Sequence, residues 1–430
     1  MRQQRRQEHQ KRQRIIAGLS VALLAITFGV IYLVIQATSI PEQRLTAEST
    51  KPTKPMQESS SSTETKPEVK TITVTASGDM LYHTPVYLSA YDGKRYDFDN
   101  DFEQVKPLIA SADLALGDFE GTINPNKPLG GFPLFNAPID AVASIKDAGF
   151  DVIDLAHNHI LDTGIEGVKT TAAAFHDQGL ATIGVTVDNS GILVKEVNGI
   201  KVALLAYAYG FNGLEESLTQ AEYDTYLKDL SLDKVEAEIK EAETLADITI
   251  VMPQSGVEYS LEPTEEQQTV YRKMIDFGAD IIFGGHPHVA EPTEIIEKDG
   301  EKKFIIYSMG NLLSNQRYET VNNNYWTERG VIPEVEITKQ GARTYLSKIA
   351  LHPTWVSKEP IPDRTYYDPE YGVLQAFDFQ VYLAEDYLPD GQYAKRVPEE
   401  KRQRIETAYH EMLELLDLKW EQQKENQNDQ

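Results

Sequence analysis

Five of the nine histidines in this 430-residue chain fall in or beside short segments that also contain Asp, Glu or Asn. Residues 157–159 read His-Asn-His, residues 286–288 read His-Pro-His, and His83 follows another such segment. The chain has no cysteine, so any metal must be bound by imidazole, carboxylate or amide groups. These donors suit one or two divalent cations such as Mn, Zn or Fe, which activate water and neutralise a phosphoryl or carbonyl oxygen. The residue types therefore indicate hydrolysis or group transfer at a metal centre.

Short apolar segments rich in β-branched residues precede these polar groups and predict buried strands. Eight of them recur, at residues 71–76, 113–116, 151–156, 181–185, 201–208, 248–252, 280–284 and 303–308. Six are followed by side chains that can bind a metal or form hydrogen bonds: residues 77–79 (Ser-Gly-Asp), 117–120 (Gly-Asp-Phe-Glu), 157–164 (His-Asn-His-Ile-Leu-Asp-Thr-Gly), 253–259 (Pro-Gln-Ser-Gly-Val-Glu-Tyr), 285–288 (Gly-His-Pro-His) and 309–311 (Met-Gly-Asn). The carboxyl ends of parallel strands meet at one edge of an open α/β sheet, so we expect these groups to gather there.

Helical patterns lie between several of the predicted strands. Three of them are closed by a glycine: residues 139–148 before Gly149, 165–178 before Gly179, and 264–277 before Gly278. The third begins with Thr264 and has Gln267 three residues later, which is the spacing of a capping box. The alternation of strands and helices predicts a layered α/β domain over residues 71–350.

The N-terminus predicts a membrane anchor. Residues 15–35 are 21 residues without a charge, long enough at 1.5 Å per residue to cross a hydrocarbon core of about 30 Å. Residues 1–14 contain six Lys and Arg against one Glu, a net charge of +5, so we expect this basic tail to stay cytoplasmic and the main domain to lie outside the cell, in a single-pass topology. The alternative is a cleaved signal peptide, whose apolar region is normally shorter.

Two further regions flank the predicted domain. Residues 36–70 are rich in Ser, Thr and Pro with little to bury, and predict a disordered linker. Residues 351–430 begin with a segment rich in Pro, Tyr and Asp and predict a C-terminal extension with a helix from Glu399 to about Gln423. The whole chain has a net charge of −26, and because residues 1–14 contribute +5, the remainder carries −31. This negative charge argues against nucleic acid as a partner.

Six motifs, in this order, resemble the CapA/PgsA family of poly-γ-glutamate capsule proteins: Gly-Asp, Gly-x-x-Glu, Asn-His-x-x-Asp-x-Gly, Gly-x-Glu-Tyr, Gly-His-Pro-His and Ser-x-Gly-Asn. The resemblance covers roughly residues 71–320. It implies a metallophosphatase-like (calcineurin-type) sandwich that is preceded here by the membrane helix. It also implies a part in the synthesis or export of an anionic polymer, poly-γ-glutamate.

The resemblance also implies roles for the matching residues. The implied metal ligands, with Glu120 as the bridge between two ions, are Asp79, Glu120, Asn158, His286 and His288. His159 would be the general acid or an orienting donor. Asp162 would fix the tautomer of an imidazole, and Asn311 would shape the loop near the site.

The sequence departs from the family pattern at two positions. Asp118 stands where Asn is common, and Gln254 stands where a metal-ligating His is common. Glutamine is a poorer ligand than imidazole, so we expect the second ion to bind weakly or not at all. His157, at a position often occupied by Asn, could partly compensate.

Three functions follow from these features. The first is a membrane-anchored, extracellular component of poly-γ-glutamate synthesis or export. The second is a surface metal-dependent phosphoesterase unrelated to capsule. The third is a non-catalytic scaffold whose C-terminal helix recruits membrane synthase subunits. The sequence therefore leaves open whether the chain is an enzyme.

Overall fold

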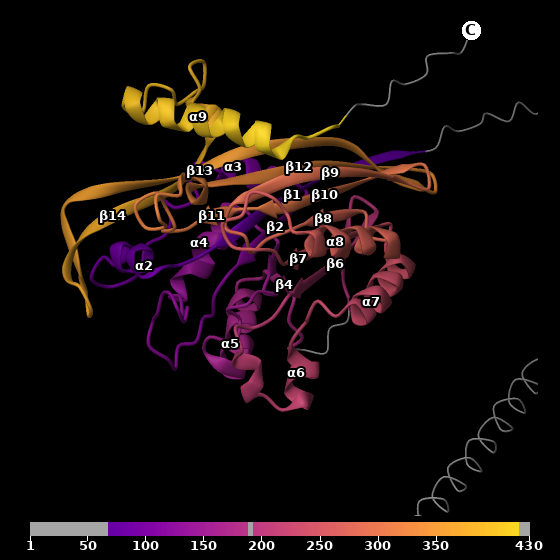
Figure 1. The fold of residues 1–430 in the computed structure, drawn as a ribbon, viewed down its shortest axis with the longest axis horizontal. Helices are drawn as coiled ribbons and strands as arrows, with labels where there is room; N and C mark the ends of the chain where they lie inside the picture. The colour runs from indigo at the N-terminus through magenta and orange to yellow at the C-terminus, as the bar shows by residue number, and fades with distance from the viewer. Residues whose placement is uncertain (1–67, 188–191, 421–430) are drawn as a thin grey trace, which may run out of the picture. The chain divides into compact units, whose positions relative to one another are not determined.

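The computed structural model describes residues 68–187 and 192–420 (Figure 1). The predicted cytoplasmic tail, the predicted membrane helix and residues 36–67 of the predicted linker lie outside these ranges. Within them, no helix combines the length and the hydrophobicity needed to span a bilayer. The linker prediction was wrong at its last residues: strand β1 begins at Val69, because Val69 and Lys70 pair with Gln340 and Lys339 of strand β12.

Two β-sheets form the centre of the described domain. The larger has eight strands, of which seven follow the order β14 (Gly372–Leu383), β13 (Arg343–Asp368), β12 (Arg329–Gln340), β1 (Val69–Met80), β2 (Leu114–Phe119), β3 (Val152–Asp154) and β4 (Ala181–Ile183), while β11 (Asn311–Leu313) pairs with β1. The smaller has the order β5 (Leu193–Val197), β6 (Ile200–Ala208), β7 (Ile248–Gln254), β8 (Ile281–Phe283), β10 (Glu301–Met309) and β9 (Ala290–Lys298). Strands β1 to β4 are parallel to one another, as are β6, β7, β8 and β10, so each sheet has one edge where carboxyl ends meet.

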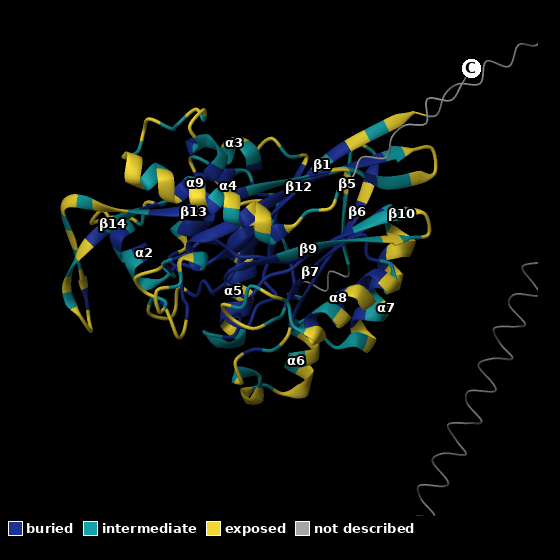
Figure 2. Cartoon of the chain, turned by 45° about the horizontal axis from the view of Figure 1, so that its top comes forward, coloured by how far each residue is buried: buried dark blue, intermediate teal, exposed yellow. Residues whose placement is uncertain are grey.

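The sheets and helices are layered because alternate residues of a strand face opposite sides. In β7, Ile250 contributes to the core shared with Val74 of β1, whereas the next residue, Val251, packs with helices α7 (Leu232–Leu245) and α8 (Glu265–Phe277). In Figure 2 the centre of the sheets is dark blue, whereas the strand ends and the outer faces of α7 and α8 are teal and yellow. The predicted layered α/β architecture is confirmed.

The helix ends follow the signals in the sequence. Helix α4 (Asp140–Ala148) ends at Gly149, whose φ of 104° lies in the left-handed region that favours glycine. At the start of α8 the predicted capping box is confirmed: the Gln267 N–H donates to the Thr264 hydroxyl, and the Gln267 side chain accepts from the Thr264 N–H. The remaining helices and 3₁₀ turns before the C-terminal region are α2 (Thr84–Ala90), α3 (Lys106–Ile109), α5 (Gly164–Asp177), α6 (Gln220–Tyr226), η1 (Leu214–Ser217) and η2 (Tyr325–Glu328).

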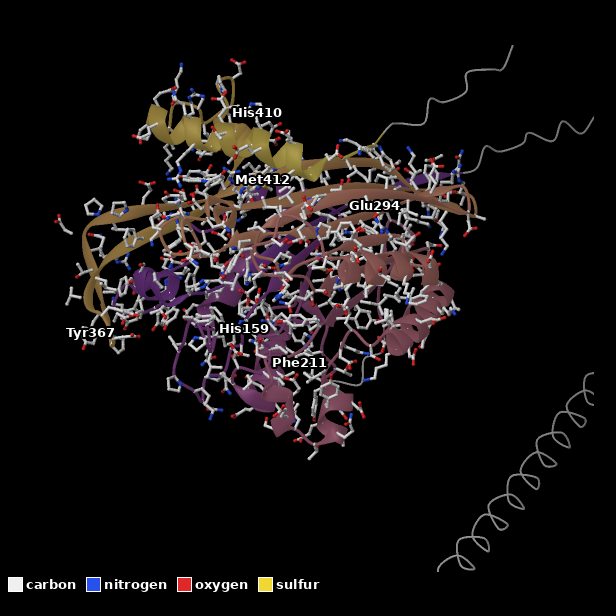
Figure 3. The ribbon with its side chains drawn as sticks, viewed as in Figure 1. His159, Phe211, Glu294, Tyr367, His410 and Met412 are labelled. Carbon is white, nitrogen blue, oxygen red and sulfur yellow. The ribbon has the colours of Figure 1, made fainter. Side chains whose placement is uncertain are left out.

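The C-terminal region is continuous with the larger sheet. The boundary expected at residue 350 lies inside β13, and residues on both sides of it belong to one compact unit. After β14 and η3 (Ala384–Tyr387), helix α9 (Glu399–Leu416) runs above β12 and β13 in Figure 1. Its buried Met412 lies on the side toward the sheet and its exposed His410 on the outer side (Figure 3). The helix ends earlier than expected, at Leu416, because the next residue, Asp417, takes a left-handed conformation with a φ of 44°.

Candidate metal centre

Several residues that the sequence pattern placed in loops are the last residues of strands. Strand β1 continues through Asp79 to Met80, because β11 pairs with it there and brings Asn311 opposite Asp79. Asp118 lies in β2, and Gln254 is the final residue of β7. The strands therefore hold these side chains more rigidly than loops would.

A row of three aspartates crosses the carboxyl ends of neighbouring strands. Asp79 of β1 pairs in register with Asp118 of β2, which pairs in turn with Asp154 of β3. None is more than 3% exposed. Burial, followed by the charges of Asp154 and Asp79, raises the pKa of Asp118 well above its usual value. Burial raises the pKa of Asp154 in the same way.

Asp79, Glu120 and His288 form a compact group of possible ligands. One ligand atom from each lies within 4.8 Å of the others. The Nδ1 atom of His288 is 2.9 Å from Asp79 Oδ2 and 3.8 Å from Glu120 Oε2. Within the described part of the chain, Asp79 Oδ1 and both carboxylate oxygens of Glu120 have no hydrogen-bond partner. Buried carboxylate oxygens without partners are costly, and a divalent cation is the ligand that such a group of oxygen and imidazole donors fits.

The protonation of this group reflects the crowding of buried acids around one imidazole. Burial lowers the pKa of His288, but Glu120 and Asp79 outweigh it and raise that pKa to about 9. Burial raises the pKa of Glu120 to about 7, although the charge of His288 opposes this. Without a cation, the proton on His288 partly balances the carboxylates. Metal binding therefore requires the loss of that proton.

The backbone turns sharply at both histidines of the His-Pro-His segment. His286 has a φ of 96° and His288 a φ of 57°, a conformation that costs a non-glycine residue on the order of 1–3 kcal/mol and is typical of functional sites. Their ring centroids are 6.0 Å apart. Burial and the charge of His288 lower the pKa of His286 to about 4, so its imidazole is neutral at pH 7. Among the described residues its Nδ1 atom has no hydrogen-bond partner, which leaves it available as a ligand.

Gln254 holds Asn158 instead of offering a free ligand atom. The Asn158 backbone N–H donates to Gln254 Oε1 at 2.8 Å, and Gln254 Nε2 donates to Asn158 Oδ1 at 3.1 Å. The amide of Asn158 donates in turn to Asn212 Oδ1 at 3.2 Å. Since the side-chain oxygens of Gln254 and Asn158 both already accept a hydrogen bond, a second cation would depend mainly on His286 and the shared Glu120. The assignment of Asn158 and His286 as ligands stays a prediction.

His159 and Asp162 form a hydrogen-bonded pair beside the metal group. His159 Nδ1 is 2.7 Å from Asp162 Oδ2, and the same oxygen accepts the Phe135 N–H at 2.6 Å. Burial lowers the pKa of His159, but the hydrogen bond to Asp162 and the charge of Glu120 outweigh it, so the net shift is upward. The predicted contact of Asp162 with an imidazole is present. The part of His159 in proton transfer stays a prediction.

His157 and Asn311 form hydrogen bonds with the segments that carry Glu120 and His288. The Gly121 N–H, which follows Glu120 in the chain, donates to His157 Nε2 at 3.4 Å. Burial lowers the pKa of His157 well below its usual value, so its ring is neutral. The Asn311 amide donates to the carbonyl oxygen of His288 at 3.2 Å, and its Oδ1 atom is 3.2 Å from His288 Nδ1. Both residues therefore position the loops that carry Glu120 and His288.

A small cleft opens onto this centre. Its volume is about 210 Å³, and its lining includes His83, His159, His288 and Glu258. Phe132, which is 76% exposed, lies at its rim. Burial and the charge of His288 lower the pKa of His83 to about 3, so this ring is neutral.

The sequence pattern missed two residues of the site, Asp154 and Asn212, and it gave His83 no role there. Asp154 was a carboxylate inside an apolar strand segment, a signal that could have identified it. Asn212 lies in the loop after β6 (Ile200–Ala208), which is a seventh strand followed by a polar side chain of the site. His83 was visible beside the first motif, but only the fold shows that it lines the cleft.

Glycine permits the close approach of the two strands that carry Asp79 and Asn311. A Cβ atom on Gly78 would lie 1.9 Å from the carbonyl oxygen of Gly310. The Asp79 N–H donates to that same oxygen at 3.1 Å. The first and last motifs of the chain are therefore joined directly through their backbones.

These features define a layered α/β protein with a buried carboxylate and histidine centre at the carboxyl ends of its parallel strands. The family model of the bacterial capsule synthesis protein PGA_cap matches residues 73–316, and the chain belongs to this family. The resemblance to the CapA/PgsA family is thus confirmed.

Two relatives illustrate how far the similarity reaches. The capsule biosynthesis protein CapA of Bacillus anthracis is 30% identical over 259 residues, which are 58% of this chain and 61% of that protein. The PGA biosynthesis protein CapA of Bacillus subtilis (strain 168) is 28% identical over 287 residues, 62% of this chain and 70% of that protein. A solved calcineurin-like phosphoesterase from Bacillus subtilis aligns with 81% of this chain and 99% of its own at 11% identity, with a TM-score of 0.37, a similarity too weak to identify a fold or function.

Proposed function

We propose that this protein is a membrane-anchored, extracellular component of poly-γ-glutamate synthesis or export, and that its metal centre acts directly on the polymer. The observation that carries the proposal is the buried group of Asp79, Glu120 and His288 in a chain of the capsule synthesis family. The names of the two Bacillus relatives, which refer to capsule and PGA biosynthesis, support the choice of polymer.

The residues of the centre would divide the chemistry among them. A divalent cation such as Mn, Zn or Fe, held by Asp79, Glu120 and His288, would polarise a carbonyl or phosphoryl oxygen and lower the pKa of a bound water. His159, whose pKa is raised, would donate a proton to a leaving group in the cleft. Asp162 would keep the Nδ1 proton of His159 in place, so that Nε2 faces the substrate. One cation is better supported than two, because the oxygen of Gln254 is already hydrogen-bonded.

The membrane part of the proposal rests on the sequence. Residues 15–35 would anchor the chain, with the basic tail inside and the domain outside. Protease added to intact cells should remove the domain and leave the N-terminal tail protected. A domain that is digested only after lysis would contradict the proposed topology.

The capsule function is tested by deletion and complementation. Loss of the gene should abolish surface poly-γ-glutamate, and the wild-type gene should restore it. A gene carrying Asp79→Asn should fail to restore it although the protein accumulates normally, because the substitution removes a ligand charge. An unchanged capsule after deletion would refute the function. Full restoration by the variant would assign the chain to a non-catalytic scaffold that recruits synthase subunits.

The pair of His159 and Asp162 beside the metal group is equally compatible with a second candidate, a surface phosphoesterase unrelated to capsule. This candidate predicts that the purified protein hydrolyses a chromogenic phosphate ester when Mn or Zn is added, and that His159→Gln reduces turnover by about 100-fold or more. Equal rates for the wild type and the Asp79→Asn variant would refute it.

A further inference from the structure

A second cavity lies away from the metal cleft, between the start of α9, β13, β14 and the segment at residues 317–319. Its volume is about 720 Å³, within the range of cavities that bind small molecules. Its lining contains three Glu and five cationic side chains: Arg317, Lys358, Arg396, Lys401 and Arg404. Trp355, Phe377 and Tyr382 supply aromatic surface. An excess of positive charge is unusual in a chain whose net charge is −26.

Three of the five cations already neutralise carboxylates of the protein. Arg317 and Arg404 both bind Glu328, whose oxygens they reach at 3.1 and 2.8 Å. Arg317 also lies 3.7 Å from a carboxylate oxygen of Glu319. Lys401 pairs with Glu359. These pairs fix the shape of the cavity and leave their cations little charge to offer to a ligand.

Lys358 and Arg396 are different. Across the described residues, neither has a carboxylate within ion-pair distance. Lys358 donates to Asn315 Oδ1 at 2.8 Å, and its Nζ atom lies 4.4 Å from the centre of the Phe377 ring. The Arg396 guanidinium lies 3.9 Å from the centre of the Tyr393 ring. Aromatic rings orient both cations without neutralising them.

The environment of Lys358 favours an added anion. Partial burial, followed by the nearby charge of Arg317, lowers the pKa of Lys358 to about 8. The protein thus holds a lysine in a place where its charge is unfavourable, and a bound carboxylate would offset that cost.

One short segment separates this cavity from the metal cleft. Asn315, which accepts from Lys358, also lines the metal cleft, where its N–H donates to His83 Nδ1 at 3.4 Å. Arg317 and Glu319 line the basic cavity, whereas Gln316 and Thr320 line the metal cleft. A long ligand that enters one cavity therefore has the other within reach along the same segment.

We propose that the cavity under α9 is an anion-binding site that uses Lys358 and Arg396 to bind carboxylate groups of an acidic polymer while another part of the same polymer lies at the metal centre. The identity of the polymer rests on the proposed function, which makes it γ-linked glutamate. The site explains how a strongly acidic protein can hold a polyanion that its overall charge would repel.

The test is binding of a fluorescent, γ-linked glutamate oligomer to the full-length protein, followed by fluorescence anisotropy. The test variant carries Lys358→Gln and Arg396→Gln. The control carries Lys94→Gln and Lys395→Gln, which remove the same charge from exposed lysines outside the cavity. We expect Kd to rise about tenfold or more in the test variant and less than about twofold in the control, with unchanged thermal midpoints in both. Wild-type Kd should also rise with salt.

Three results would overturn the site. They are equal weakening by both variants, a test variant that binds like the wild type, and a wild type that does not bind the oligomer. Displacement of the oligomer by inorganic phosphate at far lower concentration than by free glutamate would overturn the assignment to carboxylates. The capsule assay separates this inference from the proposed function. If deletion abolishes the capsule and a test variant with normal oligomer binding restores it fully, the proposed anion-binding site is refuted and the proposed function is not.

Discussion

The most informative perturbation of the centre is Glu120→Gln, because it should act in opposite directions with and without metal. Glu120 is buried, and within the described residues neither of its carboxylate oxygens has a hydrogen-bond partner. Without a cation the ionised carboxylate destabilises the fold, and glutamine removes that charge at nearly the same volume. With a cation present, the same substitution removes a ligand.

The size of the first effect follows from the pKa. Burial raises the pKa of Glu120 from 4.5 to about 7, and each unit corresponds to about 1.36 kcal/mol. Because the pKa is higher in the folded state, the wild type is most stable below pH 4.5, where Glu120 is protonated in both the folded and the unfolded state. Its free energy of unfolding then falls as the pH rises through 7. At pH 8 in a chelator, the variant should therefore be more stable than the wild type by about 3 kcal/mol, which is roughly 5 °C in Tm. The difference should vanish near pH 4.

The second effect follows from mass action. A cation at 100 times its Kd should stabilise the wild type by about 2.7 kcal/mol, and the variant should lose most of this gain. The assay is thermal unfolding with EDTA and with excess MnCl₂. The matched control is Glu258→Gln, the same chemical change at an exposed position of the same cleft, which should keep the metal response. A Glu120→Gln protein that is less stable in EDTA and still stabilised by Mn would refute the reasoning.

Three other substitutions test separate parts of the structure. Gly78→Ala places a methyl group 1.9 Å from a backbone oxygen and should lower the free energy of unfolding by about 3 kcal/mol or more, whereas Gly210→Ala meets open space and should change it by less than about 1 kcal/mol in chemical denaturation. Asp162→Asn removes the anion that raises the pKa of His159, so NMR titration of that imidazole should give a lower pKa, and an unchanged value would contradict the pairing. Glu291→Gln replaces a buried acid whose pKa burial raises to about 8; its gain in Tm over the wild type should grow between pH 5 and pH 9, and a constant difference would mean that Glu291 does not titrate there.

Local signals predicted the parts of the fold that local interactions determine. The capping box of Thr264 and Gln267 and the left-handed Gly149 each depend on neighbouring residues, so the sequence was sufficient. The long hairpin of β13 and β14 was missed, because the second half of β13 is polar and rich in Pro and Tyr. This half is ordered by pairing with β14, since the pairing of β13 with β12 ends at Trp355. Tyr367, at the end of that hairpin in Figure 3, is one example.

The same distinction applies to the site. The order of the motifs predicted that Asp79, Glu120 and His288 belong to one site, and the fold places these three residues together. The engagement of Gln254 with Asn158 could not be predicted, because it depends on two amides that are 96 residues apart in the chain. The row from Asp79 to Asp154 was missed because it depends on the register of three strands.

The central claim is that Asp79, Glu120 and His288 bind a divalent cation. The most direct measurement is the anomalous diffraction of a crystal grown with Mn. We expect an anomalous peak at roughly 2.0–2.3 Å from a carboxylate oxygen of each acid and a nitrogen of His288. A crystal in which Mn occupies other sites while these three side chains stay free of anomalous density would contradict it.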